Sequence, residues 1–95
     1  MIHMVEIVNL RTCKDWGKPG DVRIDRKTKW GNPFKIGRGV TRKQSIDSYE
    51  EYFIANLMSS LKELDGALRL GCWCKPLPCH GDVIKKYFEK WKIGE

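Results

Sequence analysis

The segment from residue 67 to residue 91 constrains the fold most, because an apolar strand runs through a short turn into an amphipathic helix. Alternation along residues 67–74 predicts a strand whose one face carries Leu68, Leu70, Cys72 and Cys74. The following KPLP sequence predicts a rigid turn. Helical spacing from residue 80 then predicts an apolar helix face made of Val83, Ile84, Tyr87, Phe88 and Trp91.

The rest of the chain predicts two further strands and two helices. Strands are expected at residues 4–10, buried on both faces, and at residues 21–26, where Val22 and Ile24 alternate with polar residues. Thr41 and Gln44 have the spacing of a capping box, so a helix begins there; a break is expected near residues 58–59. The order β-β-α-α-β-α predicts a small two-layer or three-layer α/β domain with a short, mainly parallel sheet. A fourth strand or a second copy in a homodimer would complete so small a sheet.

Length and composition favour one globular domain spanning residues 1–95, with 41% hydrophobic and 32% charged residues. No apolar run approaches the roughly 20 residues that cross a bilayer, so we expect no membrane partner. The beginning of the chain lacks the pattern of a secretory signal. We therefore expect a cytoplasmic, reducing location, in which clustered cysteines indicate metal binding or reactivity before disulfides.

The positive charge is concentrated in one third of the chain. Residues 11–43 hold eleven basic and three acidic side chains, whereas the remainder is slightly acidic. Such a segment fits a phosphate-bearing partner, either a nucleotide or a nucleic acid. A basic surface that binds no ligand is the alternative.

The turn after the third predicted strand gathers four soft ligands, namely Cys72, Cys74, Cys79 and His80. These residue types suit a zinc ion. The C-x-C spacing is less suitable than the usual C-x₂-C, because alternate strand residues lie about 6.5 Å apart while two thiolates on zinc lie about 3.7 Å apart. A zinc site therefore needs a bulge or strand end at this point.

The same turn also suggests a reactive site. Cys79 and His80 precede a predicted helix, and a helix N-terminus stabilises anions and thiolates. Cys79 as nucleophile, His80 as acid or base and Asp82 beside them are the catalytic candidates, although the sequence shows no complete set of nucleophile, base and orienting group. The alternative is structural, with buried cysteines and with His80 and Asp82 capping the helix.

The segment DRKTKWGNPF mixes basic and aromatic residues in a long loop, the kind of loop that often carries function. Trp30 could stack on a base, Arg26 could hold phosphate and the Asn32 amide could read a ligand edge. We expect Phe34 to pack the loop onto the core, and the sequence leaves Trp30 open between core and ligand.

These segments resemble a small domain-of-unknown-function family of bacterial, archaeal and phage proteins. The resemblance covers about residues 5–90 and rests on VNLR at 8–11, Arg26 with WGNPF at 30–34, Arg42, and GCWCKPLPCHGD at 71–82. It implies that the WGNPF loop and the cysteine–histidine turn are the sites that members share, and it implies no activity. Asp25 departs from the glycine expected before Arg26.

Two functions remain open. In the first, a nucleotide or nucleic acid binds at the sheet edge, with or without catalysis, and the ligand is held by Arg11, Arg26, Trp30, Asn32 and Arg42. In the second, a non-enzymatic module stabilised by zinc binds nucleic acid or protein through its basic segment.

Overall fold

The computed structural model describes residues 5–37, 39–73 and 77–94, and the elements within them follow the predicted order. They are β1 (Glu6–Asn9), β2 (Asp21–Arg23), α1 (Arg42–Asn56), the 3₁₀ helix η1 (Met58–Leu64), β3 (Arg69–Cys72) and α2 (Gly81–Lys92). The small α/β fold is confirmed, while the expected second copy stays a prediction. The strands are shorter than the sequence indicated.

The sheet has the order β1-β3-β2 in the described part of the chain, and both pairings are parallel. Ile7 and Val22 both lie beside Leu70, so the three strands are in register at their centres. The central strand is therefore β3, whose Leu70 and Cys72 are fully buried. The prediction that the first strand is buried on both faces is wrong, because β1 is an edge strand and its Ile7 and Val8 are only half-buried.

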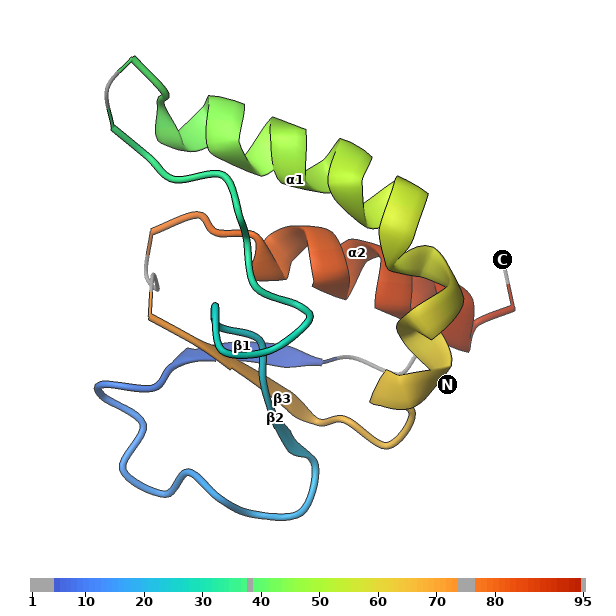
Figure 1. Cartoon of the computed structure of the whole chain (residues 1–95). Helices are drawn as coiled ribbons and strands as arrows, with labels where there is room; N and C mark the ends of the chain where they lie inside the picture. Colours follow the sequence, from blue (N-terminus) through green and yellow to red (C-terminus); the bar gives the residue numbers. More distant parts are fainter. Residues whose placement is uncertain (1–4, 38, 74–76, 95) are drawn as a thin grey trace.

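The two faces of the sheet are covered differently (Figure 1). The helices α1, η1 and α2 lie on one face, and the loop of residues 10–20 lies on the other. A Cβ atom at Gly71 would approach side-chain atoms of Leu10 and Trp16 to 2.6 Å, so only glycine lets this loop pack on the central strand. The fold is a two-layer α/β structure with an irregular cover on its second face.

Arg69 fastens this loop to the sheet. Its guanidinium donates two hydrogen bonds of 2.7 Å to Asp21 and one of 2.9 Å to Asp15, and it lies 5.8 Å from the ring centre of Trp16. The hydrogen bonds from Arg69 lower the pKa of Asp21 to about 2. The positive charge of Arg69, on the central strand, is therefore neutralised by carboxylates beside it.

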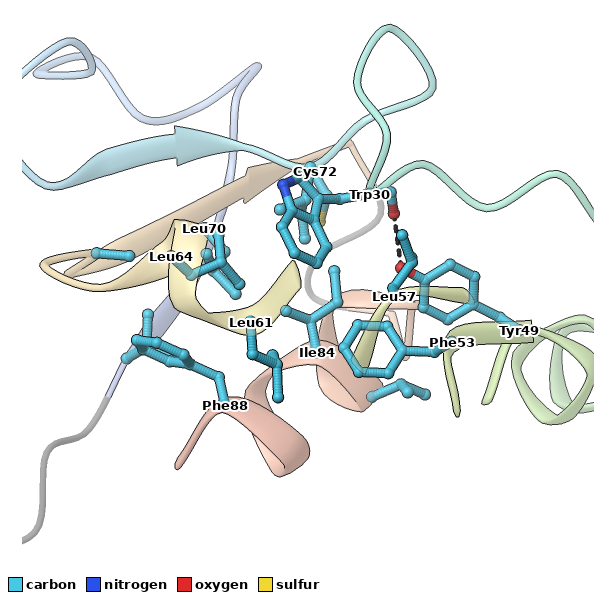
Figure 2. Packing of buried hydrophobic residues seen from close by; sticks show 14 of the residues in the cluster. Trp30, Tyr49, Phe53, Leu57, Leu61, Leu64, Leu70, Cys72, Ile84 and Phe88 are labelled. Atoms are coloured by element: carbon cyan, nitrogen blue, oxygen red, sulfur yellow. Dashed lines mark hydrogen bonds between the residues drawn. The ribbon is translucent and has the colours of Figure 1, made fainter. Parts of the chain in front are cut away.

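Helix α2 buries Val83, Ile84 and Phe88 of its predicted apolar face, whereas Trp91 is 38% exposed. The capping box of Thr41 and Gln44 is present, and α1 ends at Asn56 before the predicted break. The buried side chains of the helix layer include Tyr49, Phe53, Leu57, Leu61, Ile84 and Phe88 (Figure 2). None of the helices in the described ranges is long and apolar enough to cross a membrane.

We predict that the Tyr49 hydroxyl stabilises the fold by holding the WGNPF loop on α1. It donates a buried hydrogen bond of 2.7 Å to the Trp30 carbonyl (Figure 2). Tyr49→Phe leaves that carbonyl unsatisfied, so the free energy of unfolding should fall by about 1–2 kcal/mol in urea denaturation. Tyr52→Phe is the matched control, because the Tyr52 hydroxyl has no hydrogen-bond partner among the described residues. Equal losses in the two variants would contradict this role.

Candidate functional site

A pocket of about 480 Å³ opens where the carboxyl ends of β2 and β3 meet the beginning of α2. We call it the site pocket. Parallel strands of an α/β sheet bring their loops together at this edge, which is the usual place for ligands. Six residues that the sequence singled out line it, namely Arg26, Asn32, Arg42, Cys72, Cys79 and His80.

The WGNPF loop forms one wall of the site pocket. A Cβ atom at Gly31 would lie 2.5 Å from the Arg26 Cα atom, so this glycine lets the loop fold back against the backbone of Asp25 and Arg26. The Asn32 amide donates to the Ser45 hydroxyl at 2.9 Å and accepts from the Phe34 N–H at 2.8 Å. Asn32 therefore ties the loop to α1 with the groups that were expected to read a ligand.

The two aromatic residues of this loop differ in burial, and the structure settles the place of Trp30, which the sequence had left open. Trp30 is only 5% exposed, packs against Phe53 in the core and does not line the site pocket (Figure 2). Phe34 is 37% exposed, meets the Tyr52 ring edge-on and lines the site pocket. The expectation that Phe34 packs into the core is wrong, and Phe34 is the aromatic residue of the loop that a ligand can reach.

His80 lies at the back of the site pocket with only 7% of its surface exposed. Its Nε2 atom is 2.6 Å from the Ile24 carbonyl, which can only accept, so the ring proton lies on Nε2. Burial lowers the pKa of His80, which keeps the ring neutral at pH 7. In that tautomer Nδ1 is an acceptor, and it has no hydrogen-bond partner within the residues that the structure describes.

His80 is the N-cap residue of α2, but Asp82 in the first turn supplies the side-chain contact there. The Asp82 carboxylate accepts the Cys79 backbone N–H at 3.1 Å, while the His80 side chain makes no capping bond. Asp82 does not line the site pocket. Of the three catalytic candidates, the structure thus brings Cys79 and His80 to the pocket. The Asp82 carboxylate instead holds the backbone at the beginning of α2.

Cys72 and Cys79 form a close pair of buried thiols. Their Sγ atoms lie 3.4 Å apart, one at the end of β3 and the other just before α2. Gly81 lets the beginning of α2 pack against the sheet, because a Cβ atom there would lie 2.9 Å from the Ile24 side chain. The predicted ligand Cys74 lies outside the described residues, and among the described ones no group of three metal-ligating side chains comes together.

The basic side chains at the site pocket differ from those elsewhere in the described chain. Arg26 and Lys27 make no ion pair within the described residues, and Arg42 donates only to the Pro78 carbonyl, at 3.1 Å. Many of the other cations pair with carboxylates, as in Lys18, Lys29, Lys43, Arg69, Lys85, Lys86 and Lys92. Arg11 lies in the loop of residues 10–20, is exposed and does not line the pocket.

Asp25 is a pocket residue that the sequence analysis did not select. It is 6% exposed and accepts hydrogen bonds from the Arg23 guanidinium and, at 3.1 Å, from the Trp73 indole. Burial alone would raise the pKa of Asp25, but these donors outweigh it and lower the pKa, so the carboxylate is charged. Its position at the end of an alternating strand, before two basic residues, was the available signal.

Comparison with known proteins places this chain within a family. The family described as "Domain of unknown function (DUF4326)" matches residues 8–90. Over 71 residues the chain is 43% identical to a protein of Enterobacteria phage T4 described as "Uncharacterized 12.4 kDa protein in nrdA-td intergenic region". That match covers 67% of this chain and 63% of the relative, so the chain spans a little under two thirds of the relative's length. No solved structure matches the chain.

The buried His80 predicts a loss of stability in mild acid. Its pKa is lower in the folded than in the unfolded chain, where it is near 6.5, so acidification below that value favours unfolding. The free energy of unfolding should fall by at most about 1 kcal/mol between pH 6.5 and 5.5. His80→Gln keeps a donor for the Ile24 carbonyl but does not titrate, so its stability should change less over this range. Parallel profiles of the wild type and this variant would contradict the prediction.

Proposed function

The chain belongs to the DUF4326 family, and we propose that it binds a nucleotide in the site pocket. The phosphate would lie against Arg26, Lys27 and Arg42, and the base would lie against the apolar side chains of the opposite wall. The observation that carries the proposal is the set of basic side chains without acidic partners around this pocket, in a chain that pairs many of its other cations.

Electrostatics support an anionic ligand here. Arg26 and Lys27 are exposed, so an incoming phosphate meets them without first breaking a salt bridge. Helix α2, with twelve residues, begins at the pocket and contributes the partial positive charge of its N-terminus. Asp25 is the acidic residue in the pocket wall, and Arg23 offsets its charge.

The apolar wall supports a ligand that carries a planar ring. Phe34, Ile36 and Ile46 line the pocket, and Phe34 and Ile36 are 37% and 49% exposed. Trp73 is exposed as well, and the hydrogen bond from its indole to Asp25 fixes the ring at the pocket. Aromatic faces beside phosphate-binding groups are the usual means of holding a nucleotide base.

Substitution of the unpaired cations tests the proposal. By isothermal titration calorimetry with nucleoside 5′-monophosphates, Arg26→Ala and Arg42→Ala should each weaken binding at least about tenfold, because each removes a charge-assisted contact. Lys43→Ala is the matched control, since Lys43 neighbours Arg42 in sequence but pairs with Asp47 at 2.7 Å. Equal losses in all three variants, or no binding by the wild type, would contradict the proposal.

A free nucleotide and a nucleotide unit of a nucleic acid offer the same chemistry to this pocket. Titration with a short single-stranded oligonucleotide separates them. Tighter binding of the oligonucleotide, with an affinity that falls steeply with salt, would identify a nucleic acid as the partner. Equal or weaker binding would identify the mononucleotide.

Catalysis on the bound ligand stays a prediction that rests on Cys79 and His80. Both line the pocket, and the neutral His80 ring offers Nδ1 as a base. A screen for turnover of the nucleotides that bind, with His80→Gln as the comparison, is the direct test.

A zinc-stabilised module is the second candidate function. The 3.4 Å separation of the Cys72 and Cys79 thiols is close to the roughly 3.7 Å between two thiolates on one zinc ion, and this observation favours it. Against it, His80 uses Nε2 for the Ile24 carbonyl and has only Nδ1 left as a ligand atom. Elemental analysis of protein purified without chelator decides: about one zinc per chain would support a metal site, and a trace amount in folded protein would exclude it.

A further inference from the structure

We infer that the site pocket selects ribonucleotides, with Asp25 and His80 as acceptors for the ribose hydroxyls. This inference rests on the proposed nucleotide binding. It concerns the ribose, for which neither the cations nor the apolar wall provides a binding partner. It depends on two buried residues with acceptor atoms, Asp25 and His80, which line the pocket together with cationic donors and apolar groups.

The Asp25 carboxylate has acceptor capacity left after its contacts within the protein. Its Oδ2 atom accepts from Arg23 and Trp73, and from the described residues its Oδ1 atom accepts only a long 3.3 Å bond, donated by the Lys27 backbone N–H. An ionised carboxylate offers about four lone-pair positions, so one on Oδ1 remains for a donor. The three existing contacts hold the group in one orientation.

His80 supplies the second acceptor beside the first. Its Nε2–H is donated to the carbonyl of Ile24, the residue before Asp25. The imidazole is therefore held next to the segment that carries the Asp25 carboxylate. The Tyr49 ring also packs against the imidazole in a T-shaped contact, with 5.1 Å between the ring centres. A neutral ring fixed in this way presents Nδ1 as an acceptor and cannot donate from it.

The position of these acceptors next to the phosphate-binding residues points to sugar hydroxyls as their partners. Arg26 and Lys27 occupy the middle of a turn that the Thr28 N–H closes on the Asp25 carbonyl at 3.0 Å. Asp25 therefore lies next to the groups expected to bind phosphate. In a nucleotide the hydroxyls of the ribose are attached to the ring that carries the phosphate, whereas amino groups lie on the base beyond it. The apolar wall of Phe34 and Ile46 is suited to that base.

Analogues that lack the hydroxyls test the inference on the unmodified protein. The probes are the ribonucleoside 5′-monophosphate that binds best, its 2′-deoxy form and its 2′,3′-dideoxy form, compared by calorimetry at one salt concentration. Removal of both hydroxyls should weaken binding at least about tenfold, because a site built around a donor is left with unpaired buried acceptors. Equal affinity for the three compounds would overturn the inference and leave the proposed phosphate binding intact.

Two variants test whether Asp25 and His80 cause the dependence of binding on the ribose hydroxyls. Asp25→Asn and His80→Gln should each reduce the ratio between the ribose and dideoxy affinities while still binding the dideoxy compound. Asp15→Asn is the matched control, since Asp15 is an exposed carboxylate that pairs with Lys18 away from the pocket, and its ratio should equal that of the wild type. Thermal melting identifies variants that fail to fold. A preference for amino-bearing bases without any effect of the hydroxyls would contradict the inference, and no binding of any nucleotide would refute the proposed function as well.

Discussion

The parallel pairing of β3 with both β1 and β2 is the constraint on which the rest of the structure depends. Because the three strands run in one direction, the chain leaves β2 and β3 at the same edge of the sheet. The WGNPF loop and the beginning of α2 consequently meet there, although they lie far apart in the sequence. Glycine at positions 31 and 81 allows both segments to approach closely enough to form a pocket with Cys79 and His80 in its wall.

The distribution of ion pairs determines the charge at this edge of the sheet. The acidic side chains neutralise cations on the sheet, on the helices and in the loop of residues 10–20, as Asp15 and Asp21 do for Arg69. The cations that face the pocket have no such partners in the described part of the chain. A modest excess of positive charge is thereby concentrated at one apolar-lined opening, which is the arrangement that a phosphate-bearing ring compound requires.

Periodicity and capping signals predicted the order of elements, the capping box at Thr41 and, apart from exposed Trp91, the apolar face of α2. Local patterns placed Phe34 in the core wrongly and left Trp30 open, because the position of the loop depends on the Tyr49 hydroxyl reaching the Trp30 carbonyl across the fold. Asp25 looked like a solvent-facing residue of an alternating strand, and the tertiary contact with Trp73, beside a local one with Arg23, accompanies its burial in the pocket wall. The edge position of β1 followed from strand order, which alternation within a strand does not encode.

The most direct test of the account is a titration of ¹⁵N-labelled protein with a ribonucleoside 5′-monophosphate, followed by amide and indole N–H chemical shifts. The account predicts saturable shifts of the Arg26 and Lys27 amides, the Trp73 indole and the Gly81 amide, all with one dissociation constant. These groups belong to three separate segments that converge only at the site pocket or at the helix end beside it. Absence of shifts, or shifts centred on residues 11–20 on the opposite face of the sheet, would contradict it.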